Sequence, residues 1–555
     1  MRSLPASARP SAELTADGGP SSAAYGISSR GLPGAHARDG STLRKVSTSA
    51  DGNGAELLRD VLRAPVYEAA VVTPLEVMES LSERLGNTVE VKREDRQAVH
   101  SFKIRGAYTR MRALTPDEAG HGVVAASAGN HAQGVALSAS LLGIEAVVVM
   151  PVTTAPIKVD AVRSHGARVI LHGDTFDEAK AEALRLADEH GHTYVAPFDD
   201  PLVIAGQGTI GLELIQQDAH LDRVFVPVGG GGLAAGVAAL VKNLMPGIKV
   251  IGVEPEDAAC LSAALAAGHP VELPEVSRFA EGVAVKLIGD RTFAMCREHL
   301  DDVVTVDSDE ICAAIKDIFE DVRAVAEPAG AVALAGLKKY VEEHEIRGER
   351  LAHILSGANV NFHTLRYISE RAEVGEQREA LYGVTIPERA GSFLEFLRVL
   401  RGRAVTEFNY RVDGSDEARI FVGVQLVRGA AERVEIVDAF TAAGYPVIDL
   451  SDDDTAKTHV RYMIGGHPPA LAEQVYSFEF PEHPGALTKF LTQLGTRWNI
   501  TMFHYRSHGA DYGRVLCAFE GVADDADFAE HLEALGYPFR DVTTSPALSY
   551  FLLPR

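Results

Sequence analysis

Apolar and polar residues alternate in a regular way through the middle of the chain, from about residue 57 to residue 370. Short runs of apolar, β-branched residues are each followed by a longer run with helical periodicity. GVVAAS leads into NHAQGVALSASLLG, AVVVMP into IKVDAVRSHG, and RVFVPV into LAAGVAALVKNL. Such alternation indicates a parallel sheet covered by helices on both faces. Ligands of these sheets bind beyond the carboxyl ends of the strands, so the residues just after each strand are the candidates for chemistry.

The pattern changes after residue 380, where the rest of the chain contains an internal duplication. The stretches VTIPERAGSFLEFLRVL, TEFNYR and AAGYPVIDLS reappear as FEFPEHPGALTKFLTQL, TMFHYR and ALGYPFRDVT. Each copy reads as strand, loop, helix, strand, strand, helix and strand, the order of a ferredoxin-like βαββαβ unit. An acidic linker over about residues 453–473 separates the two copies.

Residues 1–54 differ from both regions in composition. They are rich in Ser, Ala, Gly and Pro, with arginines and few acidic residues. A segment with so few apolar residues does not bury enough surface to fold, so we predict a disordered tail. The composition also resembles that of an organellar transit peptide, and a plain tail or an over-extended start of translation explains it equally well.

Charge and cysteine usage narrow the class of protein. The chain has 555 residues and a net charge of −24, so neither nucleic acid nor a membrane surface is expected as the main partner. No apolar run approaches the ~18 residues that span a bilayer. The four cysteines are scattered without metal-binding spacing, which predicts no metal site and reduced thiols in a cytoplasmic protein, or an organellar one if residues 1–54 are a transit peptide.

The stretch EVKREDRQAVHSFKIRGAY places Lys103 between Phe102 and Ile104 at the start of an expected helix. An amine among apolar neighbours loses hydration, which lowers its pKa and makes the neutral, nucleophilic form accessible. Lysines of this kind form Schiff bases with carbonyl compounds. The alternative is a helix-surface lysine whose stem covers an apolar neighbour.

Four consecutive glycines, Gly229 to Gly232, follow the apolar run RVFVPV and precede a helix that starts near Leu233. Without side chains, their backbone N–H groups can converge on an anion at the positive end of the helix. We therefore predict a phosphate site, with a flexible turn as the alternative. The stretch lacks the G-x-x-x-x-G-K-[ST] pattern, which argues against a nucleoside triphosphate.

Two further strand ends carry polar residues. SAGNHAQG, with Ser127, Gly129, Asn130 and His131, again precedes a helix, so its amides can hold a carboxylate while Asn130 donates to a ligand oxygen; a helix cap is the alternative. In LAHILSGAN the apolar run ends at Leu355 and is followed by Ser356, a lone hydroxyl that taken by itself would usually be a turn residue. An amine, an anion cradle, an amide and a hydroxyl, all at strand ends, are the groups that together bind pyridoxal 5′-phosphate.

The motifs HSFKIRGAY, SAGNHAQG, PVGGGGLAAG, FAEGVAVKLIG, VRAVAEPAGA and HILSGANVNFHTLRYISER resemble those of biosynthetic threonine dehydratase (threonine deaminase). That family consists of pyridoxal-phosphate enzymes of the tryptophan-synthase-β fold type. The resemblance runs from about residue 57 to the C-terminus. It implies an α/β, fold-type-II catalytic domain over residues 55–375, followed by ACT-like regulatory domains over residues 380–452 and 474–548.

The resemblance also implies a role for each site residue. Lys103 is the catalytic Schiff-base lysine, Phe102 packs against the pyridine ring, and Asn130 binds the ring's 3-oxygen. Gly229 to Gly232, with Leu233 beside them, hold the phosphate, and Ser356 contacts the ring nitrogen. The substrate-binding residues are Ser127, Ala128, Gly129 and His131.

The expected reaction is dehydration and deamination of L-threonine to 2-oxobutanoate and ammonia, the committed step of isoleucine biosynthesis. L-Serine is expected to react by the same route. The neutral hydroxyl of Ser356 would leave the ring nitrogen without the partner that deepens the cofactor's electron sink, which suits prompt loss of the β-hydroxyl. Two other classes are a sister enzyme, such as a serine dehydratase or racemase, and an amino-acid sensor that has lost catalysis. The intact site residues argue against the sensor, and the two regulatory copies argue against the sister enzymes.

By resemblance, isoleucine inhibits from the duplicated modules, valine opposes it as an activator, and the enzyme is a homotetramer. In each copy a strand-to-helix loop, around Gly391 or Gly485, could receive the effector's carboxylate. Aromatic residues on a following strand could form the wall of its apolar pocket; the alternatives are that they belong to the core, and that the modules serve only oligomerisation. These residues are Phe408, Tyr410, Phe503 and Tyr505.

Overall fold

The computed structural model describes residues 52–551, except 363, 376–377, 388–391, 402, 404, 411–416, 463–472, 482–497, 499, 507–511 and 523–524. The chain begins with α1 (Gly52–Arg63), which packs through Val61 against α8 and α9. The predicted tail of residues 1–54 therefore ends too late, because residues 52–54 already belong to this helix. Residues 1–51, for which we predict disorder, lie outside the described residues.

The catalytic region contains two sheets instead of the single parallel sheet that the apolar pattern indicates. The larger sheet has the strand order β1-β2-β10-β7-β8-β9, in which only the β1–β2 pair is antiparallel. The smaller sheet has the order β5-β4-β3-β6 and is parallel throughout. A uniformly apolar run in the sequence shows where a strand lies and that it is buried, but it does not show which strands are neighbours in a sheet.

The bounds of the strands of the larger sheet are β1 (Leu75–Val77), β2 (Thr88–Arg93), β7 (Arg223–Pro227), β8 (Lys249–Pro255), β9 (Asp302–Val306) and β10 (Arg350–Leu355). Those of the smaller sheet are β3 (Val123–Ala126), β4 (Ala146–Met150), β5 (Arg168–Leu171) and β6 (Thr193–Tyr194). The helices are α2 (Glu79–Leu85), α3 (Lys103–Arg112), α4 (Pro116–His121), α5 (Asn130–Leu142), α6 (Pro156–Ser164), α7 (Phe176–His190), α8 (Pro201–Gln217), α9 (Gly232–Leu244), α10 (Cys260–Ala267), α11 (Asp290–His299), α12 (Ser308–Val322), α13 (Pro328–Glu343) and α14 (Thr364–Gly375).

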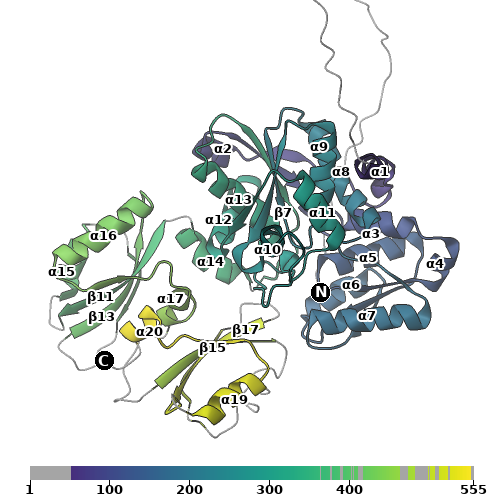
Figure 1. Ribbon diagram of the computed structural model, residues 1–555. Helices are drawn as coiled ribbons and strands as arrows, with labels where there is room; N and C mark the ends of the chain where they lie inside the picture. Colours follow the sequence, from purple (N-terminus) through teal and green to yellow (C-terminus); the bar gives the residue numbers. More distant parts are fainter. Residues whose placement is uncertain are drawn as a thin grey trace, which may run out of the picture. The chain divides into compact units, whose positions relative to one another are not determined.

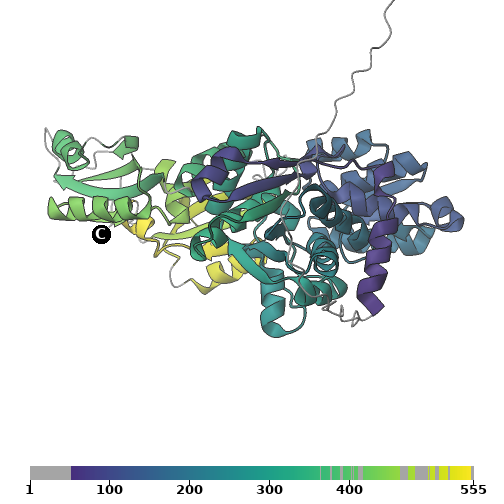
Figure 2. The same ribbon diagram turned by 90° about the horizontal axis from the view of Figure 1, so that it is seen from above.

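Helices cover both faces of each sheet, as the pattern predicts (Figure 1; Figure 2). Successive residues of a strand point to opposite faces. On β7, Phe225 belongs to a core shared with α12, α13 and α14, whereas its neighbours Val224 and Val226 belong to a core shared with α8 to α11. The smaller sheet is divided in the same way between α5 with α6 on one face and α7 on the other.

The duplicated segment forms two four-stranded antiparallel sheets, with the orders β12-β13-β11-β14 and β16-β17-β15-β18. This is the ferredoxin-like arrangement that the repeat predicts. Figure 1 shows α15 and α16 beside the first sheet and α19 beside the second. The elements are β11 (Glu379–Pro387), α15 (Ser392–Val399), β12 (Val405–Tyr410), β13 (Glu417–Gln425), α16 (Ala430–Ala442), β14 (Val447–Asp449), β15 (Glu473–Pro481), β16 (Ile500–Arg506), β17 (Tyr512–Glu520), α19 (Ala526–Ala534) and β18 (Phe539–Asp541).

The predicted linker over residues 453–473 is in part folded. It contains α17 (Asp454–Thr458) and a short 3₁₀ helix, and the buried Ala456 and Val460 pack there. They join one apolar cluster with strand residues of both modules and with α20 (Pro546–Phe551). The acidic residues in and just before α17 are the reason that the sequence pattern indicates a linker here. Among the described residues, no helix is long and apolar enough to cross a membrane.

Candidate active site

The helix that carries Lys103 begins beside the end of strand β10. Phe102 donates its backbone N–H to the Ser356 carbonyl at 3.1 Å, and Ala358 donates to the His100 carbonyl at 2.9 Å. His100 has a φ of +53°, a left-handed conformation that is uncommon for a residue other than glycine. These two bonds bring Lys103 and Ser356, which are far apart in sequence, to the same edge of the larger sheet.

Burial of the Lys103 amine disfavours its charged form. Its Nζ donates to the Pro197 carbonyl at 3.2 Å, and burial lowers the pKa of the amine to about 8, with the carboxylate of Glu327 opposing the shift. A pKa near 8 leaves a usable fraction of neutral amine close to neutral pH. The environment therefore suits a nucleophile, as the sequence predicts.

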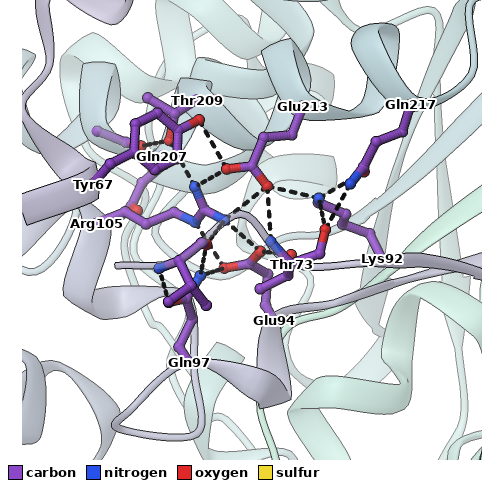
Figure 3. Close-up of polar contacts among 12 residues, drawn as sticks. Tyr67, Thr73, Lys92, Glu94, Gln97, Arg105, Gln207, Thr209, Glu213 and Gln217 are labelled. Atoms are coloured by element: carbon purple, nitrogen blue, oxygen red, sulfur yellow. Dashed lines mark hydrogen bonds and ion pairs between the residues drawn. The ribbon is translucent and has the colours of Figure 1, made fainter. Parts of the chain in front are cut away.

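A buried ionic network holds the first turn of α3 in place (Figure 3). Arg105, two residues after Lys103, bonds two carboxylates. Its guanidinium donates to Glu94 at 2.8 and 2.8 Å and to Glu213 at 2.6 and 3.0 Å. The side chains of all three are fully buried. Bidentate pairing of this kind fixes direction as well as distance, so α3 is held between β2 and α8.

The second cation of the network is Lys92 on β2. Its Nζ lies 2.6 Å from the Glu213 carboxylate and donates to the Thr73 carbonyl at 2.6 Å. Two buried cations are thus balanced by two buried carboxylates, and neighbouring hydroxyl and amide groups supply further bonds (Figure 3). A buried charge without such partners would be strongly destabilising. Sequence reasoning did not identify this network.

The tetraglycine loop connects β7 to α9 and has no room for side chains. A Cβ on Gly230 would lie 2.2 Å from the Phe198 ring, and one on Gly229 would lie 2.8 Å from the Val283 backbone. Gly231 has a φ of +86°. Only glycine fits such a loop, whose backbone N–H groups precede a long helix. A phosphate is the group that this cradle suits.

Asn130, the first residue of α5, has a defined amide orientation. Its Nδ2 donates to Glu327 Oε1 at 2.6 Å, and its Oδ1 accepts a hydrogen bond from Asn359 Nδ2 at 2.8 Å. A carboxamide has two N–H donors, so one N–H of Asn130 is still available for a ligand oxygen. The orientation matches the predicted donor role of this residue.

Glu327 is a buried carboxyl group that sequence reasoning missed. It precedes α13 and lies in the quoted motif VRAVAEPAGA, where an acidic residue in an apolar run is the signal that could have found it. Burial raises the pKa of Glu327 to about 7, while the Asn130 hydrogen bond opposes the shift. The carboxyl group can therefore gain or lose a proton near neutral pH.

The structure brings the predicted cofactor residues together. One pocket is lined by Phe102, Lys103, Asn130, Gly229, Gly230, Gly231, Gly232, Leu233 and Ser356. The Ser356 hydroxyl donates weakly, at 3.3 Å, to the Ala329 carbonyl. The remaining lining residues were not predicted individually, although all except Phe198 lie in the quoted motifs: Phe198, Pro227, Gly282, Val283, Glu327 and Ala329.

The predicted substrate residues lie at the same strand end, in the loop between β3 and α5. Gly129 donates its N–H to the Ser127 hydroxyl at 3.3 Å, and Ala128 lies between them. His131 is buried, its Nε2 lies 2.9 Å from the Val195 carbonyl, and burial lowers its pKa to about 4. His131 is therefore neutral, and its role at the substrate stays a prediction.

Two of the six predicted effector residues lie outside the described residues, and for the other four nothing is described of the side chains. The first two are Gly391 and Gly485. Four aromatic residues lie on strands β12 and β16, as expected, but only their backbones are described: Phe408, Tyr410, Phe503 and Tyr505.

Comparison with known proteins fits this geometry. Residues 66–357 match the model of the pyridoxal-phosphate-dependent enzyme family, and residues 370–460 and 469–552 match the C-terminal regulatory domain of threonine dehydratase. An amine, an amide, a hydroxyl and a phosphate cradle in one pocket are what that cofactor requires. Fold and site thus define a pyridoxal-phosphate-dependent enzyme of fold type II with two regulatory modules.

Named relatives narrow the class further. The chain is 67% identical to the biosynthetic L-threonine dehydratase IlvA of Escherichia coli (strain K12), over 90% of this chain and 97% of that protein. It is 45% identical to the mitochondrial threonine dehydratase of Saccharomyces cerevisiae, over 90% of each chain. The processed threonine deaminase isoform 2 of Solanum lycopersicum superposes with a TM-score of 0.57 and 50% identity, covering 58% of this chain and 94% of that one. The chain belongs to the biosynthetic threonine dehydratase family.

The raised pKa of Glu327 makes stability depend on pH. The unfolded carboxyl group titrates near 4.5 and the folded one at about 7, so the stability contributed by the neutral form is complete below pH 4.5 and is lost as pH rises through 7. Glutamine is neutral throughout. We expect the unfolding free energy of Glu327→Gln, relative to the parent, to increase by about 2 to 3 kcal/mol between pH 5 and pH 8.5.

The measurement is denaturant unfolding of the full chain freed of cofactor at both pH values. Glu343→Gln, an exposed exchange at the end of the same helix, is the matched control and should show no such change. A pH-independent difference for Glu327→Gln would mean that this carboxyl group is not buried as described.

Proposed function

We propose that this chain converts L-threonine to 2-oxobutanoate and ammonia by β-elimination, as the committed step of isoleucine biosynthesis, and that it also accepts L-serine. The observation that carries the proposal is the convergence of Lys103, Asn130, the tetraglycine loop and Ser356 on one pocket. Membership of the threonine dehydratase family supplies the substrate.

The residues that hold the cofactor follow from their chemistry. Lys103 binds its aldehyde, the N–H groups of Gly229 to Gly232 bind its phosphate, and the free N–H of Asn130 binds its 3-oxygen. Phe102 and Leu233, which line the same pocket, would pack against its ring and beside its phosphate, and Ser356 would contact the ring nitrogen. When bound, the cofactor withdraws electrons from the α-carbon of the substrate.

Lys103 also moves the proton. With cofactor and substrate bound, the neutral amine of Lys103 would accept the α-proton of the substrate as a general base, which its lowered pKa favours. Glu327 holds Asn130 in its donating orientation. Ser356 offers a neutral hydroxyl to the ring nitrogen, so electron withdrawal stays moderate, which suits prompt loss of the β-hydroxyl over competing reactions.

The loop between β3 and α5 receives the substrate carboxylate. The Ser127 hydroxyl and the backbone N–H groups of Ala128 and Gly129 precede the positive end of α5, where a carboxylate is favoured, while the Ser127 N–H is bonded to the Val149 carbonyl. His131 supports this loop from behind as a neutral residue bonded to the Val195 carbonyl.

The C-terminal modules provide feedback control. Isoleucine inhibits and valine activates by binding to the modules, and a homotetramer makes the response cooperative. Inhibition requires that isoleucine bind a low-activity state more tightly than a high-activity one, and tenfold suppression corresponds to about 1.4 kcal/mol of coupling. The match of residues 370–460 and 469–552 to the regulatory domain supports this assignment.

The assignment of Lys103 makes a direct prediction. The purified protein should be yellow and should carry a link to its cofactor that borohydride reduces. Lys103→Ala should abolish both the reducible link and turnover, because no other lysine lines the pocket among the described residues. Mass spectrometry of the reduced protein checks the link, and a variant that still carries a covalently reduced cofactor would contradict the assignment. Lys158→Ala, a change at a lysine bonded to Glu281, is the control that should retain it.

The regulatory assignment is tested by removing the modules. A chain that ends after Gly375, if it folds, should form 2-oxobutanoate from threonine and be insensitive to isoleucine. If it does not fold, isoleucine binding to the full chain at increasing threonine concentrations gives a second readout, because threonine weakens binding at a separate, coupled site only to a limiting value, whereas competition for one site weakens it without limit. Unchanged inhibition of the shortened chain, or competition without limit in the full chain, would place isoleucine in the active site.

A further inference from the structure

Thr292 lies in the first turn of α11 with its side chain fully buried against the tetraglycine loop. Its hydroxyl lies 2.7 Å from the Gly230 carbonyl and 3.1 Å from the Gly289 carbonyl. A hydroxyl has one proton to donate, and the shorter distance assigns it to Gly230. The Thr292 backbone N–H donates in turn to Asp199 at 3.2 Å, the residue that follows Phe198.

The tetraglycine loop is enclosed by Thr292 on one side and by Phe198 on another. A Cβ on Gly231 would lie 2.9 Å from the Cβ of Thr292, and one on Gly230 would meet the Phe198 ring at 2.2 Å. The peptide unit between Gly230 and Gly231 therefore has little room to rotate. Among the described residues, Thr292 is the one side chain that donates to the Gly230 carbonyl, so the orientation of this peptide unit depends on it.

Peptide geometry converts this bond into an orientation of an N–H group. In a planar trans peptide the carbonyl and the following N–H point in opposite directions. With the Gly230 carbonyl bonded to Thr292, the Gly231 N–H points away from Thr292. The thiols of Cys260 and Cys296 lie 3.3 Å from the Gly229 carbonyl and 3.8 Å from the Gly231 carbonyl, so the flanking carbonyls also face side chains outside the loop.

We propose that Thr292 is a positioning residue for the cofactor phosphate: its hydroxyl bonds the Gly230 carbonyl and so aims the Gly231 N–H into the cradle. The proposal rests on the proposed function, in which Gly229 to Gly232 hold the phosphate. Thr292 acts through the loop and does not itself touch the cofactor. An N–H that is fixed before binding needs no reorganisation when the anion arrives.

The test compares two aldehydes that differ only in the phosphate. The full chain is freed of cofactor and titrated with pyridoxal 5′-phosphate and with pyridoxal, and the dissociation constants are read from absorbance. Thr292→Val removes the hydroxyl at nearly constant shape, and Thr292→Ser keeps it. We expect Thr292→Val to bind pyridoxal 5′-phosphate at least tenfold more weakly while its affinity for pyridoxal is unchanged, and Thr292→Ser to resemble the parent.

Control variants separate the possible failures. Thr305→Val, the same exchange on β9 of the larger sheet, should leave both constants unchanged. If the parent chain binds both aldehydes equally, the phosphate assignment of the proposed function fails, and the role of Thr292 fails with it. If the parent discriminates but Thr292→Val keeps the same ratio, only the role of Thr292 is wrong. Equal weakening of both aldehydes, or failure of Thr292→Ser to restore the ratio, would assign Thr292 to general packing and overturn the proposal.

Discussion

The pairing of Arg105 with Glu94 and Glu213 is the constraint on which the geometry of the active site depends. These side chains are fully buried, and the two carboxylates lie on separate elements, one just after β2 and the other on α8. Taking charges out of water is unfavourable unless every partner is in place, so the network tolerates few arrangements of these elements. Because Arg105 follows Lys103 by two residues, fixing the guanidinium also fixes the amine.

The other groups of the site are fixed by similar means from different directions. Asn130 is oriented by Glu327 and Asn359, and the tetraglycine loop is enclosed by Phe198 and Thr292. Each group follows a strand or begins a helix at the same edge of the larger sheet, or of the sheet beside it. The chemistry of the pocket thus comes from loops, and its precision comes from buried polar bonds behind them.

The residues to which we assign the chemistry could be selected from the sequence because their types are unusual where they stand. A lysine among apolar residues and four consecutive glycines after an apolar strand each indicate a ligand, and the pocket contains both. Residues that position them could not be predicted. Arg105 reads as an ordinary helix residue, and Glu213 lies 108 positions away, so only the fold reveals the pair. Thr292 likewise resembles any buried threonine until its carbonyl partner is known.

Two predictions about the fold, one parallel sheet in the catalytic region and a linker between the modules, were wrong because the sequence pattern does not show which segments are in contact. The apolar runs predicted β3, β4, β7 and the helices that follow them, but their composition did not separate the two sheets to which they belong. The linker between the modules was misread because α17 presents charged residues while burying Ala456. The repeat, in contrast, predicted a ferredoxin-like unit for each copy, and both sheets have the strand order of that unit.

The most direct test of the positioning network is the cofactor affinity of Arg105→Lys, measured well below the melting temperature of the variant. Lysine keeps the positive charge but cannot donate bidentate hydrogen bonds to each carboxylate. We expect α3 to shift enough to weaken pyridoxal 5′-phosphate binding by tenfold or more, since misplacement by ~1 Å has effects of this size. Arg112→Lys, at the exposed end of α3, should bind the cofactor as the parent does. Unchanged affinity in a folded Arg105→Lys chain would show that the network stabilises the fold without positioning Lys103.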